Sequence, residues 1–135
     1  PLAPAHEVRA EFTVQTQTAI YALAPHMHLR GKSMRVTAVA PDENERELLN
    51  VPRYDFYWQL VYRLAKPVRI ERGTKLWIDA VFDNSPANRR NPDPRATVTW
   101  GEQSREEMAV CFVDFLLPAL ISPNELFRAP RFSRP

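Results

Sequence analysis

Two of the three histidines in this 135-residue sequence stand two positions apart, in the segment His26-Met27-His28. Successive side chains of a β-strand point to opposite faces, so on a strand both imidazoles would project to the same side. Their Cβ atoms would then lie roughly 6–7 Å apart, which lets both rings reach one metal ion. The alternative is two exposed or hydrogen-bonded histidines at a strand end, and the pair by itself does not decide between them.

The kind of metal depends on the third ligand. Two imidazoles with no carboxylate or thiolate beside them suit zinc, copper or nickel. A thioether as third ligand would favour copper, and Cu(I) in particular, because this ion prefers soft sulfur donors. The sequence has three methionines, Met27, Met34 and Met108, and core packing is the ordinary role of each. Met27 would point away from both imidazoles on a strand, but spacing alone selects none of the three.

The remaining polar residues suggest no second chemistry. His6 shares a predicted strand face with apolar residues, so we expect it to be buried and hydrogen-bonded, with a third nitrogen ligand as the alternative. Asp79, Asp83 and Glu106-Glu107 do not form an acid–base couple and are interpreted as solvated or loop-fixing groups. No nucleophile triad, phosphate-binding glycine loop or Cys-x-x-Cys pattern is present. Cys111, the single cysteine, is expected to be a buried and unreactive thiol.

Short strands are the elements that must position these residues. The sequence contains 13 prolines and 3 glycines, which disfavours long helices and favours strands joined by loops. Apolar and polar residues alternate in several segments, and this predicts strands over residues 6–14, 19–28, 34–40, 58–64, 76–82, 96–100 and 107–117. Turns are predicted at residues 41–44 and 71–74, and a long surface loop at 83–94. The pattern indicates an all-β, antiparallel, jelly-roll-like sandwich of about eight strands.

Length and composition fit a single domain over residues 1–135, with a core at about 6–118 and a proline-rich extended tail at 119–135. The formal charge is +2 with both signs scattered, which is unlike the basic stripe of a nucleic-acid-binding protein. No apolar run reaches the roughly 20 residues that span a bilayer. The chain begins at Pro1 without an initiator methionine, so we interpret it as a mature form or an excised domain.

Two segments resemble one known family. His26 to Lys32 resembles the His-Thr-His segment, with its following glycine and basic residue, of the copper type II, ascorbate-dependent monooxygenases, which include peptidylglycine α-hydroxylating and dopamine β-monooxygenases. Gly101 to Met108 is similar to the family's Glu-Glu-Met or Asp-Glu-Met element, and an aromatic-rich strand follows it. The intervening elements keep the family's order, and residues 54–93 further resemble bacterial multidomain relatives. The resemblance runs from about His6 to Pro118.

The resemblance implies a specific site and a specific partner. In this family the C-terminal of two sandwich domains binds one catalytic copper ion, Cu(I) or Cu(II), and the implied ligands here are His26, His28 and Met108. Dioxygen is activated there for hydroxylation of a substrate C–H bond, with an ascorbate-like reductant. The N-terminal domain holds a second copper through three histidines and supplies an electron. No such cluster occurs here, so the chain corresponds to the C-terminal half and would need the missing domain for coupled turnover.

The sequence departs from the family pattern in its substrate-binding residues and in its cysteines, and the family also implies a location. Ala24, Val110 and Phe112 stand where the peptide-amidating enzyme has the arginine, asparagine and tyrosine that bind a peptide carboxylate. A peptide C-terminus is therefore not the expected substrate. The family's disulfides are absent, because Cys111 is alone. The family is typically secreted, so the resemblance implies an extracytoplasmic protein, periplasmic for a bacterial relative.

Two other interpretations use the same sequence differently. A non-catalytic module for copper storage, delivery or sensing would employ the same three ligands. A metal-free jelly-roll recognition domain would instead bind carbohydrate or a partner protein through Trp58, Trp77 or Tyr57.

Overall fold

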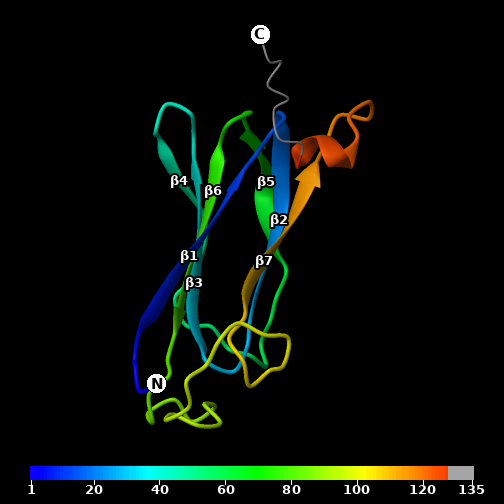
Figure 1. Cartoon of the computed structure of the whole chain (residues 1–135). Coiled ribbons are helices and arrows are strands. Elements are labelled where there is room, and N and C mark those ends of the chain that lie inside the picture. Colours follow the sequence, from blue (N-terminus) through cyan, green and yellow to red (C-terminus); the bar gives the residue numbers. More distant parts are fainter. Residues whose placement is uncertain (128–135) are drawn as a thin grey trace.

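The computed structural model describes residues 1–127 and shows two layers of antiparallel strands (Figure 1). Within these residues there are seven strands: β1 (His6–Thr13), β2 (Thr18–Met27), β3 (Gly31–Val39), β4 (Glu45–Val51), β5 (Tyr62–Ile70), β6 (Lys75–Phe82) and β7 (Ala109–Leu116). One sheet has the order β1-β6-β3-β4 and the other has the order β5-β2-β7. The predicted antiparallel all-β sandwich is confirmed, with seven strands in place of about eight.

The chain passes repeatedly from one sheet to the other. Among the described strands, only β3 and β4 are neighbours both in sequence and in a sheet. Their connection includes the predicted turn at 41–44, where Ala40 N donates to the carbonyl oxygen of Asn44 at 2.9 Å. The predicted turn at 71–74 joins β5 to β6, and it needs its glycine because Gly73 has a φ of +87°. Both turn predictions are confirmed.

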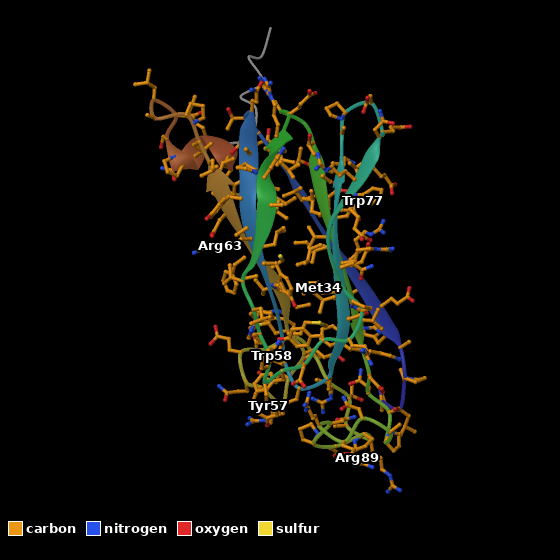
Figure 2. The ribbon with its side chains drawn as sticks, turned by 180° about the vertical axis from the view of Figure 1, so that it is seen from behind. Met34, Tyr57, Trp58, Arg63, Trp77 and Arg89 are labelled. Atoms are coloured by element: carbon orange, nitrogen blue, oxygen red, sulfur yellow. The ribbon has the colours of Figure 1, made fainter. Side chains whose placement is uncertain are left out.

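The core lies between the sheets in two clusters of buried side chains. The larger cluster consists of Val14, Ile20, Leu23, Val36, Ala38, Leu48, Leu49, Val68, Ile70, Leu76 and Leu126. The smaller cluster consists of Met27, Met34, Tyr54, Ala80 and Phe82, and Figure 2 shows Met34 between the layers. Burying a side chain as large as methionine stabilises the fold by about 1.5–3 kcal/mol. Met27 is the last residue of β2 and lies between the two histidines, so its burial in the smaller cluster anchors this end of the strand.

Two predicted strands are wrong in position or absent. Residues 96–100 form no strand, and their one ladder contact is an isolated bridge between Trp100 and Glu107. The strand predicted at 58–64 begins only at Tyr62, and the Trp58 side chain is 69% exposed. Alternation is a local pattern, whereas a strand also needs a neighbour with free backbone groups and a layer to cover. Residues 58–61 and 96–99 pair with no strand among the described residues.

The predicted extended tail is also wrong in part. Pro123–Leu126 form a 3-10 helix whose cap is Ser122, and the Ser122 Oγ accepts a hydrogen bond from Asn124 N. Leu126 is buried in the larger core cluster, and the ring of Phe127 lies 5.5 Å from that of Phe12. A single helical turn has no detectable periodicity, so composition alone could not reveal it. The rest of the predicted tail, 128–135, lies outside the described residues.

The two ends of the sandwich differ in structure (Figure 1). The 3-10 helix lies near the start of β2. The opposite end gathers the end of β2, the start of β7 and the long connection at 83–108, which contains the predicted surface loop. In the described part of the chain, no helix has the length and apolarity needed to cross a bilayer.

Candidate metal centre

The two spaced histidines lie where β2 ends. His26 is the penultimate residue of β2 and His28 follows its last residue. Their ring centroids are 5.3 Å apart and the ring planes are nearly perpendicular, at 88°. Met27, between them, is fully buried in the smaller core cluster. The strand period therefore separates the three side chains as predicted, with both imidazoles on one face and the thioether in the core.

β2 changes its hydrogen-bonding partner just before the histidines. Its pairing with β5 ends at Leu23 and Tyr62, and Pro25 has no N–H to offer on that side. Beyond this point the Tyr54 hydroxyl replaces a strand as the hydrogen-bonding partner of β2. It accepts from Met27 N at 2.8 Å and donates to the Met27 carbonyl oxygen at 2.9 Å. Burial raises the pKa of Tyr54, so the phenol keeps the proton that it donates. A loop, and not a strand, therefore borders the histidines on this side.

The loop that follows Tyr54 orients the first imidazole. His26 Nδ1 lies 2.8 Å from Gln59 Oε1. The Gln59 amide has a defined orientation, since its Nε2 donates to the carbonyl oxygen of Phe56 at 2.7 Å. An amide oxygen only accepts, so His26 Nδ1 must carry the proton. In the neutral imidazole, Nε2 then keeps its lone pair, which is the state that binds a metal.

The second imidazole is oriented from the other side of β2. His28 is 5% exposed, and its Nδ1 lies 3.2 Å from the carbonyl oxygen of Glu106. A carbonyl oxygen can only accept, so this bond also places a proton on Nδ1, and in the neutral imidazole Nε2 then keeps its lone pair. Metal-binding histidines usually have such an acceptor on the other ring nitrogen, because it sets the tautomer and the ring orientation. Both histidines thus show the hydrogen bonding that suits metal ligation.

The strand register places Met108 opposite His28. The β2–β7 ladder pairs His26 with Val110 and Met27 with Ala109, and it continues with His28 N donating to the Met108 carbonyl oxygen at 3.2 Å. Residues opposite each other in an antiparallel pair project from the same face, so Met108 belongs to the face of the imidazoles. Met27 and Met34 are buried in the core. Of the three methionines, only Met108 is near the histidines and outside the core.

Arg30 fastens the loop that precedes Met108. Arg30 is 2% exposed, and its guanidinium donates through Nη1 to the carbonyl oxygen of Arg105 and through Nη2 to that of Asp93 at 3.4 Å. Burial lowers the pKa of Arg30, while the nearby carboxylates of Glu107 and Asp93 act in the opposite direction. A second tie joins Leu29 N to the carbonyl oxygen of Ser104 at 3.3 Å. The segment after the histidines thus positions the segment before the methionine.

The two glutamates before Met108 stabilise the same loop. A carboxylate oxygen of Glu106 accepts from Gln103 N at 2.9 Å, and the Glu106 carboxylate fills the space that a side chain at Gly101 would need. Glu107 Oε1 accepts from Asn84 Nδ2 at 2.7 Å. The interpretation of these residues as loop-fixing groups is confirmed for both.

Sequence reasoning missed the residues that support the histidines. Gln59 and Tyr54 act across the fold, and nothing local in the sequence connects either to residues 26–28. Arg30 and Gly31 belong to the segment 26–32 that resembles the family, but the sequence did not indicate what either residue does. Gly31 is required by space, because an added Cβ would lie 2.6 Å from Met27 Cβ and 2.9 Å from Tyr54 Cδ1.

Comparison with known families settles what kind of domain carries this site. The family model for the copper type II ascorbate-dependent monooxygenase, C-terminal domain, matches residues 5–124. The chain belongs to this family. A comparison with curated proteins found no significant match. The match spans residues 26–32 and 101–108, it confirms the resemblance to this family, and it makes the chain a C-terminal domain of copper-dependent monooxygenases.

The departures from the peptide-amidating pattern lie together in this monooxygenase domain. Ala24 pairs with Phe112, and Val110 pairs with His26, so all three apolar substitutions share the face of the imidazoles. The rings of Phe112 and His26 have centroids 6.5 Å apart, and the Phe112 side chain is 62% exposed. The immediate surroundings of His26 on this sheet are therefore apolar.

The expectation for His6 is wrong. This side chain is exposed, and it stacks on Phe82 with ring centroids 6.4 Å apart and 28° between the planes. In the described part of the chain no element covers the inward face of β1 beside His6, and the prediction that His6 is buried is wrong for this reason. Among residues 1–127 no group of three or more His, Cys, Asp or Glu side chains could hold a metal, so His6 does not join His26 and His28. A two-histidine set needs a donor of another type.

The aromatic residues considered for recognition do not form one surface. Tyr57 and Trp58 are exposed on the loop before β5, whereas Trp77 belongs to β6 in the other sheet, as Figure 2 shows. The Trp77 ring lies under the guanidinium of Arg9, 4.3 Å from its carbon, and its Nε1 donates to Glu11. The three residues therefore belong to two separate surfaces, and recognition through one of these surfaces stays a prediction.

Cys111 lies between the layers, and we predict slow alkylation of its thiol near neutral pH. The side chain packs against both core clusters, and burial raises its pKa from 9.0 to about 11. The nucleophile is the thiolate, so the rate with iodoacetamide should rise about tenfold for each pH unit up to about 11. Rates from mass spectrometry on folded protein test this, with the urea-unfolded chain as reference. A folded rate equal to the unfolded rate would contradict it.

Proposed function

We propose that this domain binds one copper ion through Nε2 of His26, Nε2 of His28 and the thioether of Met108, and that it is the catalytic half of a two-copper monooxygenase. The observation that carries the proposal is the paired orientation of the imidazoles by Gln59 and by the Glu106 carbonyl group. Both Nε2 atoms are left free on the face to which the ladder assigns Met108.

The donor types favour copper over the other candidate metals. Imidazole nitrogen suits zinc, copper and nickel alike, but a thioether is a soft donor that selects Cu(I). When bound, copper would supply the one-electron redox chemistry that dioxygen activation needs. The protein's own contribution is to hold the rings by their Nδ1–H groups and to keep His28 away from water.

The rest of the reaction requires parts that lie outside this domain. A second electron must come from elsewhere, and we propose an N-terminal domain with its own copper, reduced by an ascorbate-like donor. The enzyme is proposed to work outside the cytoplasm, in the periplasm if the protein is bacterial. The apolar residues Ala24, Val110 and Phe112 beside His26 provide no charged partner for a carboxylate, so the substrate is not a peptide C-terminus.

A matched pair of methionine variants tests the metal site. Leucine has nearly the volume of methionine but no sulfur. Met108→Leu should weaken Cu(I) binding roughly 10- to 100-fold, because it removes a donor that prefers Cu(I), and should affect Cu(II) less. The control Met34→Leu changes a core methionine and should leave Cu(I) affinity unchanged. Affinity is measured by competition with a chromogenic Cu(I) chelator.

Spectroscopy and turnover decide between the remaining functions. The X-ray absorption spectrum of the Cu(I)-loaded wild type should show a sulfur atom bound to copper, and the spectrum of Met108→Leu should lack this contribution. Equal affinities and equal spectra for the two variants would remove Met108 from the site. Oxygen consumption by the full-length protein with ascorbate and candidate substrates tests catalysis. A protein that binds copper stoichiometrically but never turns over would be the storage, delivery or sensing module, and one that binds none would be the recognition domain.

Gln59 allows a prediction about a residue that orients His26 without binding the metal itself. Gln59→Leu removes the acceptor for His26 Nδ1, and we expect Cu(I) affinity to fall about tenfold, at the lower end of such effects. Gln59→Glu retains an acceptor oxygen and should keep an affinity close to that of the wild type. The same chelator competition measures both variants. If Gln59→Leu binds like the wild type, the hydrogen bond does not support the site.

A further inference from the structure

A cavity of about 480 Å³ opens between the two sheets on the far side of β7 from β2. Its walls come from β1, β6 and the segments 98–100 and 107–109, and they include His6, Val8, Ala80, Phe82, Trp100 and Ala109. The cavity does not include His26 or His28. It is therefore a feature separate from the imidazole pair, although the two meet at residue 108.

The cavity exists because, among residues 1–127, no strand covers the inward face of the first part of β1. In the described residues β7 is the last strand of its sheet on that side, and the irregular segment 98–100 lies beyond it. The inward-facing Val8 of β1 consequently remains 36% exposed, and Trp100 is 67% exposed. A sandwich normally packs such alternate side chains against the opposite layer. This part of the interlayer space is left open instead.

The chemistry of the walls suits a flat and uncharged molecule. The lining is mainly aliphatic and aromatic, and it presents ring surfaces from Trp100 and from the stacked pair of His6 and Phe82. The charged groups in the wall already have partners. Arg9 binds Asp79 through Nε at 2.6 Å, and Glu107 accepts from Asn84. A charged ligand would find no free counter-ion in these two side chains.

We propose that this cavity is a binding site for a small, uncharged aromatic molecule of one or two rings. Its volume lies in the range of small-molecule sites, which are roughly 300–1,000 Å³ and mostly apolar with a few polar groups. Aromatic rings attract other rings in stacked or edge-to-face geometry, and the wall offers such rings on two sides. The Thr99 hydroxyl group is a polar side chain in the lining that could orient the ligand.

Occupancy of the cavity should also affect copper binding, a consequence that rests on the proposed function. Residues 107–109 form part of the wall, and Met108 is the proposed thioether ligand. A ligand that packs against this segment biases the position of Met108. Coupling between two sites is reciprocal. If the aromatic ligand changes the Cu(I) affinity by some factor, Cu(I) must change the affinity for the aromatic ligand by the same factor.

Titration of the metal-free domain with indole tests the proposal. Saturable binding at one site is expected, with a shift of the Trp100 indole N–H signal in the ¹H–¹⁵N NMR spectrum. Val8→Phe points a ring into the cavity and should weaken binding at least about tenfold, a loss of about 1.4 kcal/mol, because the ring occupies the space that the ligand needs. Glu7→Phe adds the same ring to the outward face of β1 and should bind indole normally. Circular dichroism and thermal melts confirm that both variants fold.

The outcomes separate this proposal from the copper proposal. Absence of saturable binding, or equal binding by Val8→Phe and Glu7→Phe, overturns the aromatic site. A domain that binds no indole but dimerises with Trp100 protected would make the cavity an interface between copies, which also overturns it. Indole binding by the metal-free domain supports it whether or not copper binds. An unchanged Cu(I) affinity at saturating indole overturns only the coupling.

Discussion

Replacing His26 by alanine is expected to lower the Cu(I) affinity of this domain at least about 100-fold. The change removes one of two nitrogen donors, and loss of even an outer partner of a ligand costs about 10- to 100-fold. A 100-fold loss corresponds to about 2.7 kcal/mol of binding free energy. His26 is only partly buried and belongs to neither core cluster, so the metal-free variant should fold like the wild type. Chelator competition measures the affinity.

The third histidine offers a control of the same residue type. His6→Ala changes an exposed side chain on β1 that contacts Phe82 and is not grouped with the other two histidines. Its Cu(I) affinity should match that of the wild type. Thermal melts give a second reading, because a ligand that binds only the folded state raises its stability. Copper should raise the melting temperature of the wild type and of His6→Ala, but not that of His26→Ala. Equal losses in the two variants would refute the assigned site.

Replacing Arg30 by methionine should have the largest effect on stability, a loss of about 3 kcal/mol in the free energy of unfolding. Hydrogen bonds from charged donors contribute about 1.5–3 kcal/mol each, and Arg30 makes two, to the carbonyl groups of Arg105 and Asp93. The carboxylate of Glu107 would also lose a nearby positive charge. Chemical denaturation of the metal-free domain measures the change. Cu(I) affinity should fall as well, because the loop before Met108 loses its fastening.

Arg35 provides the matched control for this variant. It lies on β3, its side chain is 53% exposed, and its ion pair with Asp79 is long, at 3.7 Å. Exposed pairs of this kind contribute about 0–1 kcal/mol, so Arg35→Met should change the unfolding free energy by less than about 1 kcal/mol. If the two variants lose the same stability, Arg30 is not the fastening residue that its burial indicates.

Local patterns in the sequence predicted most of the strands and turns. Alternation is a property of neighbouring residues, so it located β1, β2 and β6 to within one residue at each end. It failed at 58–64 and 96–100 because burial depends on a second layer that lies far away in the sequence. The same dependence explains the errors at His6, where the opposite layer is missing, and at Leu126, where a distant core accepts a short helix.

The candidate metal centre also has features that are local in the sequence and features that depend on the fold. The sequence alone determined that His26 and His28 share a face, because strand period is local, and the resemblance of two segments identified the family. Only the tertiary structure distinguished Met108 from the two core methionines by physical means. It also decided the tautomers, since the acceptors for the two rings come from Gln59 and Glu106, 33 and 78 positions away. The tautomer of each histidine depends on contacts between residues that only folding brings together, and no spacing in the sequence indicates these contacts.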